Sequence, residues 1–304
     1  MPRIKDSVCA NPEGSLIPVG WDSYVQAIYA DGPVGFYQFA ELLAGSPVTA
    51  GSQDPQNLCF DSSAAGNLNR AVPPFANGNF LQYGSAVVAN SPSLLVTNGP
   101  SNSPGAGNNG GSALFPSTAT ASLVNIATGG SAQPPILQPT AAITVEGWHR
   151  PNVCTTGSVK QVLACYGTDA SSLAAYNLYH SGSTASNHVF AFSINIGGTL
   201  KTATASLPAL VVGATYHAAG TYDGVNVRIY VNGVLQGTTA ATGAIAYNAL
   251  GGYGLALGND PSLTDANLQG YLDETAIYNY ALSATRIAYH YREGSTYLPF
   301  IWNH

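Results

Sequence analysis

The chain has 304 residues, a formal net charge of −6 and only 8% charged residues, well below the ~25% typical of soluble domains. Its 9 Lys and Arg residues are scattered along the sequence, so the sequence does not predict the basic surface that binds nucleic acid. No segment approaches the ~18 consecutive apolar residues of a membrane helix, and we expect no membrane partner.

The composition favours β structure. Glycine (34 residues), proline (19) and tyrosine (18) are abundant, and they suit turns and strands better than helices. We therefore expect an all-β protein, built as one large domain or two ordinary ones. With so few charges, the surface must be hydrated by Ser, Thr, Asn, Gly and the backbone, or be covered by partners.

The first 20 or so residues predict an extended arm, because they lack hydrophobic periodicity and carry Pro2, Pro12 and Pro18. The opening MPRIKDSVCANPEG contains basic residues without an apolar segment behind them, so we expect no secretory signal. This favours a protein that is used in the cytosol, or that leaves it by lysis or within an assembly.

Two segments in the first half of the chain predict regular elements. Residues 24–41 predict a short helical turn, a break at the Asp31-Gly-Pro sequence and then a strand. Residues 143–151, ITVEGWHRP, predict a strand with Glu146 and Trp148 on one face and apolar residues on the other.

Residues 216–237, YHAAGTYDGVNVRIYVNGVLQG, carry the strongest local signal. The dipeptides Asp223-Gly224 and Asn232-Gly233 each separate two alternating runs, and both tolerate the positive φ of tight turns. We therefore expect two consecutive hairpins with one face on a core.

The segment GYLDETAIYNYALSATRIAYHY, residues 270–291, changes period in the middle. Its first half alternates as a strand does. From Ser283 onward the spacing is helical, and the Ser283 hydroxyl can cap a short helix from Ala284 to Tyr289.

The four cysteines lack CxxC spacing, and no histidine follows them in zinc-finger rhythm. The sequence therefore does not support a structural zinc site. We expect buried free thiols rather than a disulfide. The cysteines are Cys9, Cys59, Cys154 and Cys165.

Five motifs follow one another along the chain: YADGPVGFYQFAE, DSSAAGN, ITVEGWHRP, YHAAGTYDGVNVRIYVNGVLQG and GYLDETAIYNYALSATRIAYHY. In this order they resemble the laminin-G-like (LamG) group of the concanavalin A-like lectin/glucanase superfamily. The resemblance spans residues 24 to 292 and implies a jelly-roll sandwich of two antiparallel sheets, with the N-terminal strand beside the C-terminal one.

The resemblance also implies a domain division. We expect an extended N-terminal arm over residues 1–20 and a single LamG-like domain over 21–294. The domain carries a loop-rich insertion at about 98–140, and residues 295–304 form a C-terminal tail.

The sequence contains no residue pattern that predicts catalysis. Asp273 and Glu274 are neighbours on a predicted strand, so their side chains should face opposite ways and cannot flank one glycosidic bond. Glu146 beside Trp148 could form a sugar-stacking site, but core packing of Trp148 is the favoured interpretation. We expect no catalytic residues and no enzyme activity.

Two places could hold a ligand. The resemblance implies that Asp273 can help bind a structural calcium ion; alternatively, it accepts backbone N–H bonds at the sheet edge. The loop 258–269 could bind calcium or a glycan at the sandwich rim, or be only a turn-rich connection. Its candidate ligand-binding residues are Asn259, Asp260, Asp265 and Asn267.

We therefore expect function to reside in surfaces. The favoured hypothesis is a non-catalytic structural or adhesion protein of a virion, such as a phage head decoration, head fibre or tail protein. It would assemble in the host cytoplasm, dock through its termini on other capsid proteins and form a homo-oligomer. The alternative is an extracellular or cell-surface lectin-like adhesin that binds host glycans. A polysaccharide-active enzyme is least favoured.

Overall fold

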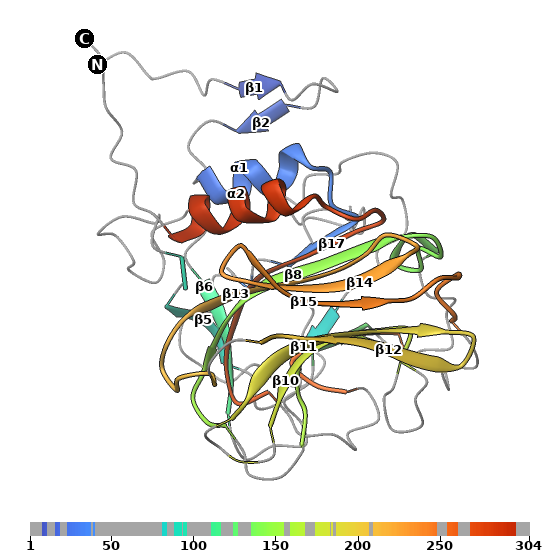
Figure 1. Ribbon diagram of the computed structural model, residues 1–304. Coiled ribbons are helices and arrows are strands. Elements are labelled where there is room, and N and C mark those ends of the chain that lie inside the picture. Colours follow the sequence, from blue (N-terminus) through green and yellow to red (C-terminus); the bar gives the residue numbers. More distant parts are fainter. Residues whose placement is uncertain are drawn as a thin grey trace, which may run out of the picture.

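The computed structural model describes residues 8–10, 16–18, 23–37, 39, 81–83, 88–92, 94–95, 111–116, 124–126, 135–154, 159–167, 174–182, 184, 187–206, 209–247, 254–260 and 268–295. Within them, two antiparallel sheets face each other as a sandwich (Figure 1). The all-β jelly-roll expectation is confirmed.

The first sheet has eight strands in the order β15-β14-β13-β8-β17-β6-β5, with β3 also paired to β17. Its central strands β8 and β17 come from the third and fifth motifs of the resemblance, and β3, from the first motif, pairs with β17. The strands are β3 (Gly35–Tyr37), β5 (Val88–Pro92), β6 (Gly111–Phe115), β8 (Ile143–Pro151), β13 (Tyr216–Tyr222), β14 (Asn226–Val231), β15 (Val234–Ala240) and β17 (Gly270–Tyr278).

The second sheet has seven strands in the order β12-β11-β10-β9-β16-β7-β4. The strands are β4 (Leu81–Tyr83), β7 (Val124–Ile126), β9 (Gln161–Tyr166), β10 (Tyr176–Ser181), β11 (Val189–Ile196), β12 (Thr199–Thr204) and β16 (Leu255–Leu257). A short 3-10 helix, η2 (Pro135–Leu137), precedes β8.

Both predicted hairpins are present. β13 pairs with β14 and β14 with β15, each antiparallel. Asn232 and Gly233 have φ values of 50° and 77°, which is the requirement of a type I′ turn. The Asp223 side chain accepts hydrogen bonds from the amides of Val225 and Asn226 at 2.9 and 2.7 Å, so it stabilises the other turn locally.

The main core lies between the two sheets, and one glycine sets how closely they approach. A Cβ atom added to Gly220 on β13 would lie 2.1 Å from the ring of Phe192 on β11. Both positions belong to buried strand segments. Only glycine at this position therefore lets the Phe192 ring approach the backbone of β13 so closely.

Two helices, α1 (Ser23–Ala30) and α2 (Ala284–Ser295), lie side by side over the outer face of the eight-stranded sheet (Figure 1). The Ser283 hydroxyl accepts a hydrogen bond from the Arg286 amide at 3.2 Å, as the predicted N-cap requires. The change of period within residues 270–291 is thus confirmed. None of the helices in the described part of the chain has the length and hydropathy to cross a membrane.

Strands β1 (Val8–Ala10) and β2 (Leu16–Pro18) form a separate two-stranded antiparallel sheet. They fall within the predicted arm. Most of the arm, much of the 98–140 insertion and residues 296–304 lie outside the described residues, so the domain division stays a prediction.

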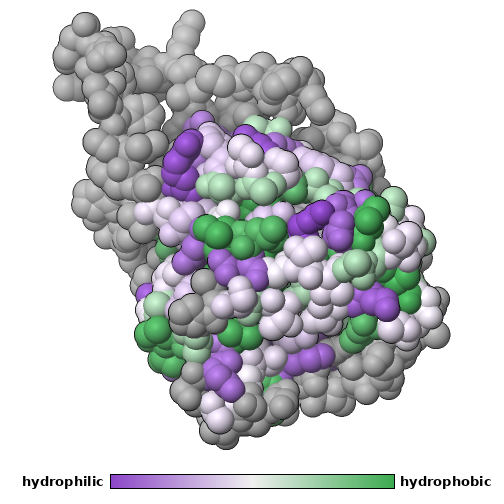
Figure 2. All heavy atoms as spheres, in the orientation of Figure 1, coloured by the Kyte–Doolittle hydropathy of each residue, from purple (hydrophilic) through white to green (hydrophobic). Residues whose placement is uncertain are grey.

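The described surface is polar but carries few charges. On the face seen in Figure 2, apolar residues form small patches separated by hydrophilic ones. Both explanations of the low charge given by the composition, hydration by neutral polar groups and coverage by partners, agree with this pattern.

Candidate functional site

A fully buried carboxylate lies between the eight-stranded sheet and the helices. Glu146 projects from β8, and its Oε2 accepts a hydrogen bond from His217 Nε2 on β13 at 3.1 Å. Its Oε1 accepts from the Tyr278 hydroxyl on β17 at 2.7 Å and faces His290 Nδ1 on α2 at 2.9 Å. Three elements of the sheet and one helix thus meet at a single carboxyl group.

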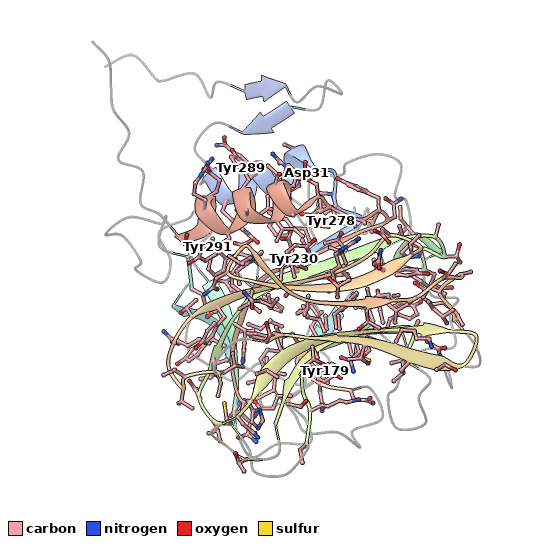
Figure 3. The ribbon with its side chains drawn as sticks, in the orientation of Figure 1. Asp31, Tyr179, Tyr230, Tyr278, Tyr289 and Tyr291 are labelled. Atoms are coloured by element: carbon pink, nitrogen blue, oxygen red, sulfur yellow. The ribbon has the colours of Figure 1, made fainter. Side chains whose placement is uncertain are left out.

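Asp31 extends this cluster to the end of α1. Its Oδ2 lies 3.0 Å from His290 Nε2 and 2.7 Å from Arg286 Nε. Arg286 also donates to the Ala27 carbonyl at 3.2 Å. Figure 3 shows Asp31 at the end of α1 and Tyr278 on the sheet beneath it. His290 therefore lies between two carboxylates and joins both helices to the sheet.

The charges of the cluster reinforce one another. Burial by itself would lower the pKa of His290, but attraction to Glu146 and hydrogen bonds to Asp31 and Glu146 outweigh it and raise the pKa to about 9. Burial would likewise raise the pKa of Glu146, yet the neighbouring His290 and His217 hold it well below its usual range. A cationic His290 and an anionic Glu146 therefore coexist at neutral pH.

Trp148, on the same face of β8 as Glu146, belongs to this packing. It is 2% exposed, meets Tyr24 edge-on with ring centroids 5.8 Å apart, and stacks on Tyr291 at 5.9 Å. Its indole has no open face for a sugar. Core packing, the favoured interpretation, is confirmed.

Asp273 and Glu274 lie at a β-bulge. The register between β17 and β8 shifts between Asp273 and Ala276, and Glu274 has a φ of 48°, which is unusual for a non-glycine residue. The predicted strict alternation is therefore wrong at this point, because the bulge inserts an extra residue. Both carboxyl groups are buried.

The charges of these acids act on Tyr24, a buried tyrosine of α1. Burial first, and then the charges of Glu146, Glu274 and Asp273, raise the pKa of Tyr24 well above its ordinary value. Asp273 Oδ2 also accepts a hydrogen bond at 2.9 Å from the amide of Leu94. This is the backbone contact weighed as the alternative to calcium, and the calcium ion itself stays a prediction.

The predicted rim loop is described at its two ends, residues 258–260 and 268–269. Asn259 and Asp260 follow β16 in the seven-stranded sheet and are fully buried. The Asn259 side-chain oxygen accepts from the Asp260 amide at 2.8 Å. Asp265 and Asn267 lie outside the described residues, so a ligand site in this loop stays a prediction.

A second polar cluster, which sequence reasoning missed, lies at one end of the sandwich. His149 Nε2 is 3.2 Å from His180 Nε2, and His180 Nδ1 is 3.0 Å from His188 Nδ1. Cys154 lies close to His180 and His188, and all of these side chains are buried. Cys154 and Cys165 are free thiols, as expected; the Cys9 side chain and Cys59 lie outside what is described.

The Laminin_G_3 family model, described as the concanavalin A-like lectin/glucanases superfamily, matches residues 125–288, more than half of the chain. The chain belongs to this superfamily. The matched span contains β8 to β17 and most of the sandwich. No curated protein matches the sequence.

Solved structures with similar folds include three from different sources. Domain 4 of AbnA, a GH43 extracellular arabinanase from Geobacillus stearothermophilus, is 15% identical, with a TM-score of 0.46 over 85% of this chain and 97% of that one. The binding domain of botulinum neurotoxin serotype G is 13% identical, with a TM-score of 0.44 over 71% of this chain and 47% of that one. A SAP-like pentraxin from Limulus polyphemus is 15% identical, with a TM-score of 0.37 over 50% of this chain and 70% of that one. At such identities the similarity concerns the fold alone.

Proposed function

We propose that this superfamily member is a non-catalytic structural and adhesion protein of a virion surface, such as a phage head decoration, head fibre or tail protein. It docks through its terminal segments on other capsid proteins and presents the jelly roll outward. The observation that carries the proposal is the β1-β2 hairpin, which pairs within itself while the sandwich forms two other sheets.

A two-stranded hairpin is marginally stable by itself in water, and its outer edges are templates for a further strand. The strand sequences, VCA and LIP, are also apolar. A partner that adds a strand or covers the hairpin would stabilise it. The low charged fraction of the chain supports the same conclusion, because a surface covered by partners needs fewer charges.

The buried acids support a non-catalytic role. Hydrolysis of a glycosidic bond needs two carboxyl groups that reach the sugar from either side. Glu146, Asp273 and Glu274 are each no more than 1% exposed. Glu146 contacts His290 of the helical layer, and Asp273 accepts a hydrogen bond from the Leu94 amide. Both carboxyl groups therefore stabilise the fold.

The docking proposal is tested with paired variants of the full chain. Ile17→Lys places a charge in β2, and Val225→Lys places one at a sandwich position that is 55% exposed. We expect wild type and Val225→Lys to form an oligomer and to be recovered in purified virions by peptide mass spectrometry. Ile17→Lys should fold but be monomeric and depleted from particles, as should a chain lacking residues 1–20. Equal incorporation of both lysine variants would refute docking through the hairpin.

The second candidate is a glycan-binding adhesin, which the outer face of the seven-stranded sheet favours. Tyr179 lies on the side of this sheet away from the helices (Figure 3), with Lys160 Nζ 4.8 Å from its ring centroid. Ser193 Oγ donates to the Tyr179 hydroxyl at 3.4 Å and shares a hydrogen bond with Thr202 at 2.8 Å. Hydroxyl groups around an aromatic ring are typical of sugar sites.

Tyr179 is only 6% exposed, so a sugar would have to displace whatever covers it, and this candidate therefore ranks second. A glycan array with and without calcium tests it. Binding that is lost in Tyr179→Ala and kept in Tyr280→Ala, whose ring is 39% exposed elsewhere, would establish it. Absence of any hit with the wild-type chain would exclude it for the glycans tested.

A further inference from the structure

The cysteine-histidine cluster at the end of the sandwich has the composition of a transition-metal site. The ligand atoms of Cys154, His180 and His188 all lie within 4.8 Å of one another, and the three residues are buried. We propose that they bind a Zn²⁺ ion, with His149 orienting His180 from behind. One thiolate and two imidazoles are ligands that zinc accepts in a tetrahedral site.

The tautomers follow from the hydrogen-bond chain. His149 Nδ1 lies 2.9 Å from the carbonyl oxygen of Tyr271, which can only accept, so Nδ1 carries the proton. In a neutral ring Nε2 is then an acceptor, and His180 Nε2, 3.2 Å away, must donate to it. The remaining nitrogen of a neutral His180, Nδ1, therefore presents its lone pair towards His188.

Neutral imidazole is the form that ligates metals. The hydrogen bonds of His149 and His180 leave such a lone pair on His180 Nδ1, on the side where His188 Nδ1 lies 3.0 Å away.

The spacing fits a shared ion. Two imidazole nitrogens bound to one tetrahedral zinc are separated by about 3.3 Å, given Zn–N bonds of about 2.0–2.1 Å. His180 Nδ1 and His188 Nδ1 are 3.0 Å apart. A hydrogen bond from its second nitrogen commonly fixes the orientation of a metal-bound histidine, and here His149, itself bonded to the Tyr271 carbonyl, receives that bond from His180.

The ligands come from three segments that the fold already holds in place. His180 is the second-last residue of β10, and His188 directly precedes β11 in the same hairpin, where the His188 carbonyl accepts from the Leu210 amide at 2.8 Å. Cys154 follows β8, and the neighbouring Val153 carbonyl accepts from Gln161 Nε2 at 2.9 Å. The ion would cross-link the loop after β8 to the β10-β11 hairpin and close this end of the sandwich.

The test uses the full chain, stripped with a chelator and titrated with Zn²⁺ alone and with Co²⁺ as a spectroscopic substitute. We expect one equivalent of zinc per chain, and with cobalt a thiolate-to-metal charge-transfer band. Cys154→Ser should abolish the band. Cys165→Ser, which removes the second buried thiol among the described residues, should leave it unchanged, and His149→Gln should weaken zinc binding by roughly 10–100-fold.

Two results would overturn the site. A wild-type chain without the charge-transfer band would show that the 3.0 Å contact between the two Nδ1 atoms is an ordinary hydrogen bond. A band that survives in Cys154→Ser would place the metal at another cysteine. If Cys154→Ser does not fold, the cobalt spectrum and zinc stoichiometry of wild type are compared with those of His188→Gln. Loss of the band and of bound zinc in His188→Gln supports the site, and no change in either refutes it.

Discussion

Glu146 and His290 face each other at 2.9 Å across 144 residues of sequence, and both side chains are fully buried. Removing two charges from water is costly unless further hydrogen bonds satisfy them. His217 and Tyr278 supply these to Glu146, and Asp31 supplies the second partner of His290. The helical layer is thus attached to the sheet by an ionic cluster as well as by apolar contact.

The first prediction concerns alkaline pH. The pKa of His290 is raised to about 9, above the ~6.5 of an unfolded histidine, so the folded state binds the extra proton between these values. The stability that His290 contributes is complete below pH ~6.5 and is lost as the pH rises through its folded pKa of about 9. We expect the free energy of unfolding to fall by on the order of 3 kcal/mol over this window.

Urea unfolding across this pH range measures the effect. His290→Gln should be less stable at neutral pH and should have a flatter pH dependence than wild type. A wild-type curve that is already flat from neutral pH to the alkaline limit would contradict the ionic account of the cluster.

Glu146→Gln tests the carboxylate itself. The change leaves a cationic His290 without its nearest counter-charge in a buried site, and we expect a loss of about 3–5 kcal/mol. Arg228→Gln is the control, because its pair with Asp223 joins side chains that are 26% and 32% exposed and should cost less than ~1 kcal/mol. Similar losses in both variants would argue against a special role for the buried cluster.

Gly220→Ala tests the close approach of the sheets. The new Cβ would lie 2.1 Å from the Phe192 ring, and such overpacking costs roughly 1–3 kcal/mol. Adding Phe192→Leu makes room for the methyl group, so the double variant should lose less than the sum of the two single changes. Additive losses would mean that the two residues do not compete for the same space.

Variants of Asp273 distinguish its two interpretations, as an acceptor for a backbone amide and as a calcium ligand. Asp273→Ala leaves the Leu94 amide without its acceptor and should cost about 1–3 kcal/mol, whereas Asp273→Asn keeps an oxygen there and should cost less. Melting temperatures with excess calcium and with EDTA complete the test. Equal values support the hydrogen bond alone, and a calcium-dependent rise that Asp273→Asn abolishes would establish the predicted ion.

Local patterns determined much of the fold. The Asn232-Gly233 turn, the strand carrying Glu146 and the helix capped by Ser283 all follow from rules that act within a few residues. The order of these segments indicated the superfamily that residues 125–288 then matched. The bulge at Glu274 escaped prediction, because it depends on the pairing of β17 with β8 rather than on the sequence of β17.

The clusters were decided by the tertiary structure. His217 and His290 lie 71 and 144 residues from Glu146 in the sequence. The cysteine-histidine cluster combines a loop and a hairpin whose spacing matches no metal motif. Which polar groups are buried together depends on strand order and register between distant segments. Local patterns therefore predicted the strands and turns in residues 143–151, 216–237 and 270–291, while long-range packing determined the partners of the buried charges.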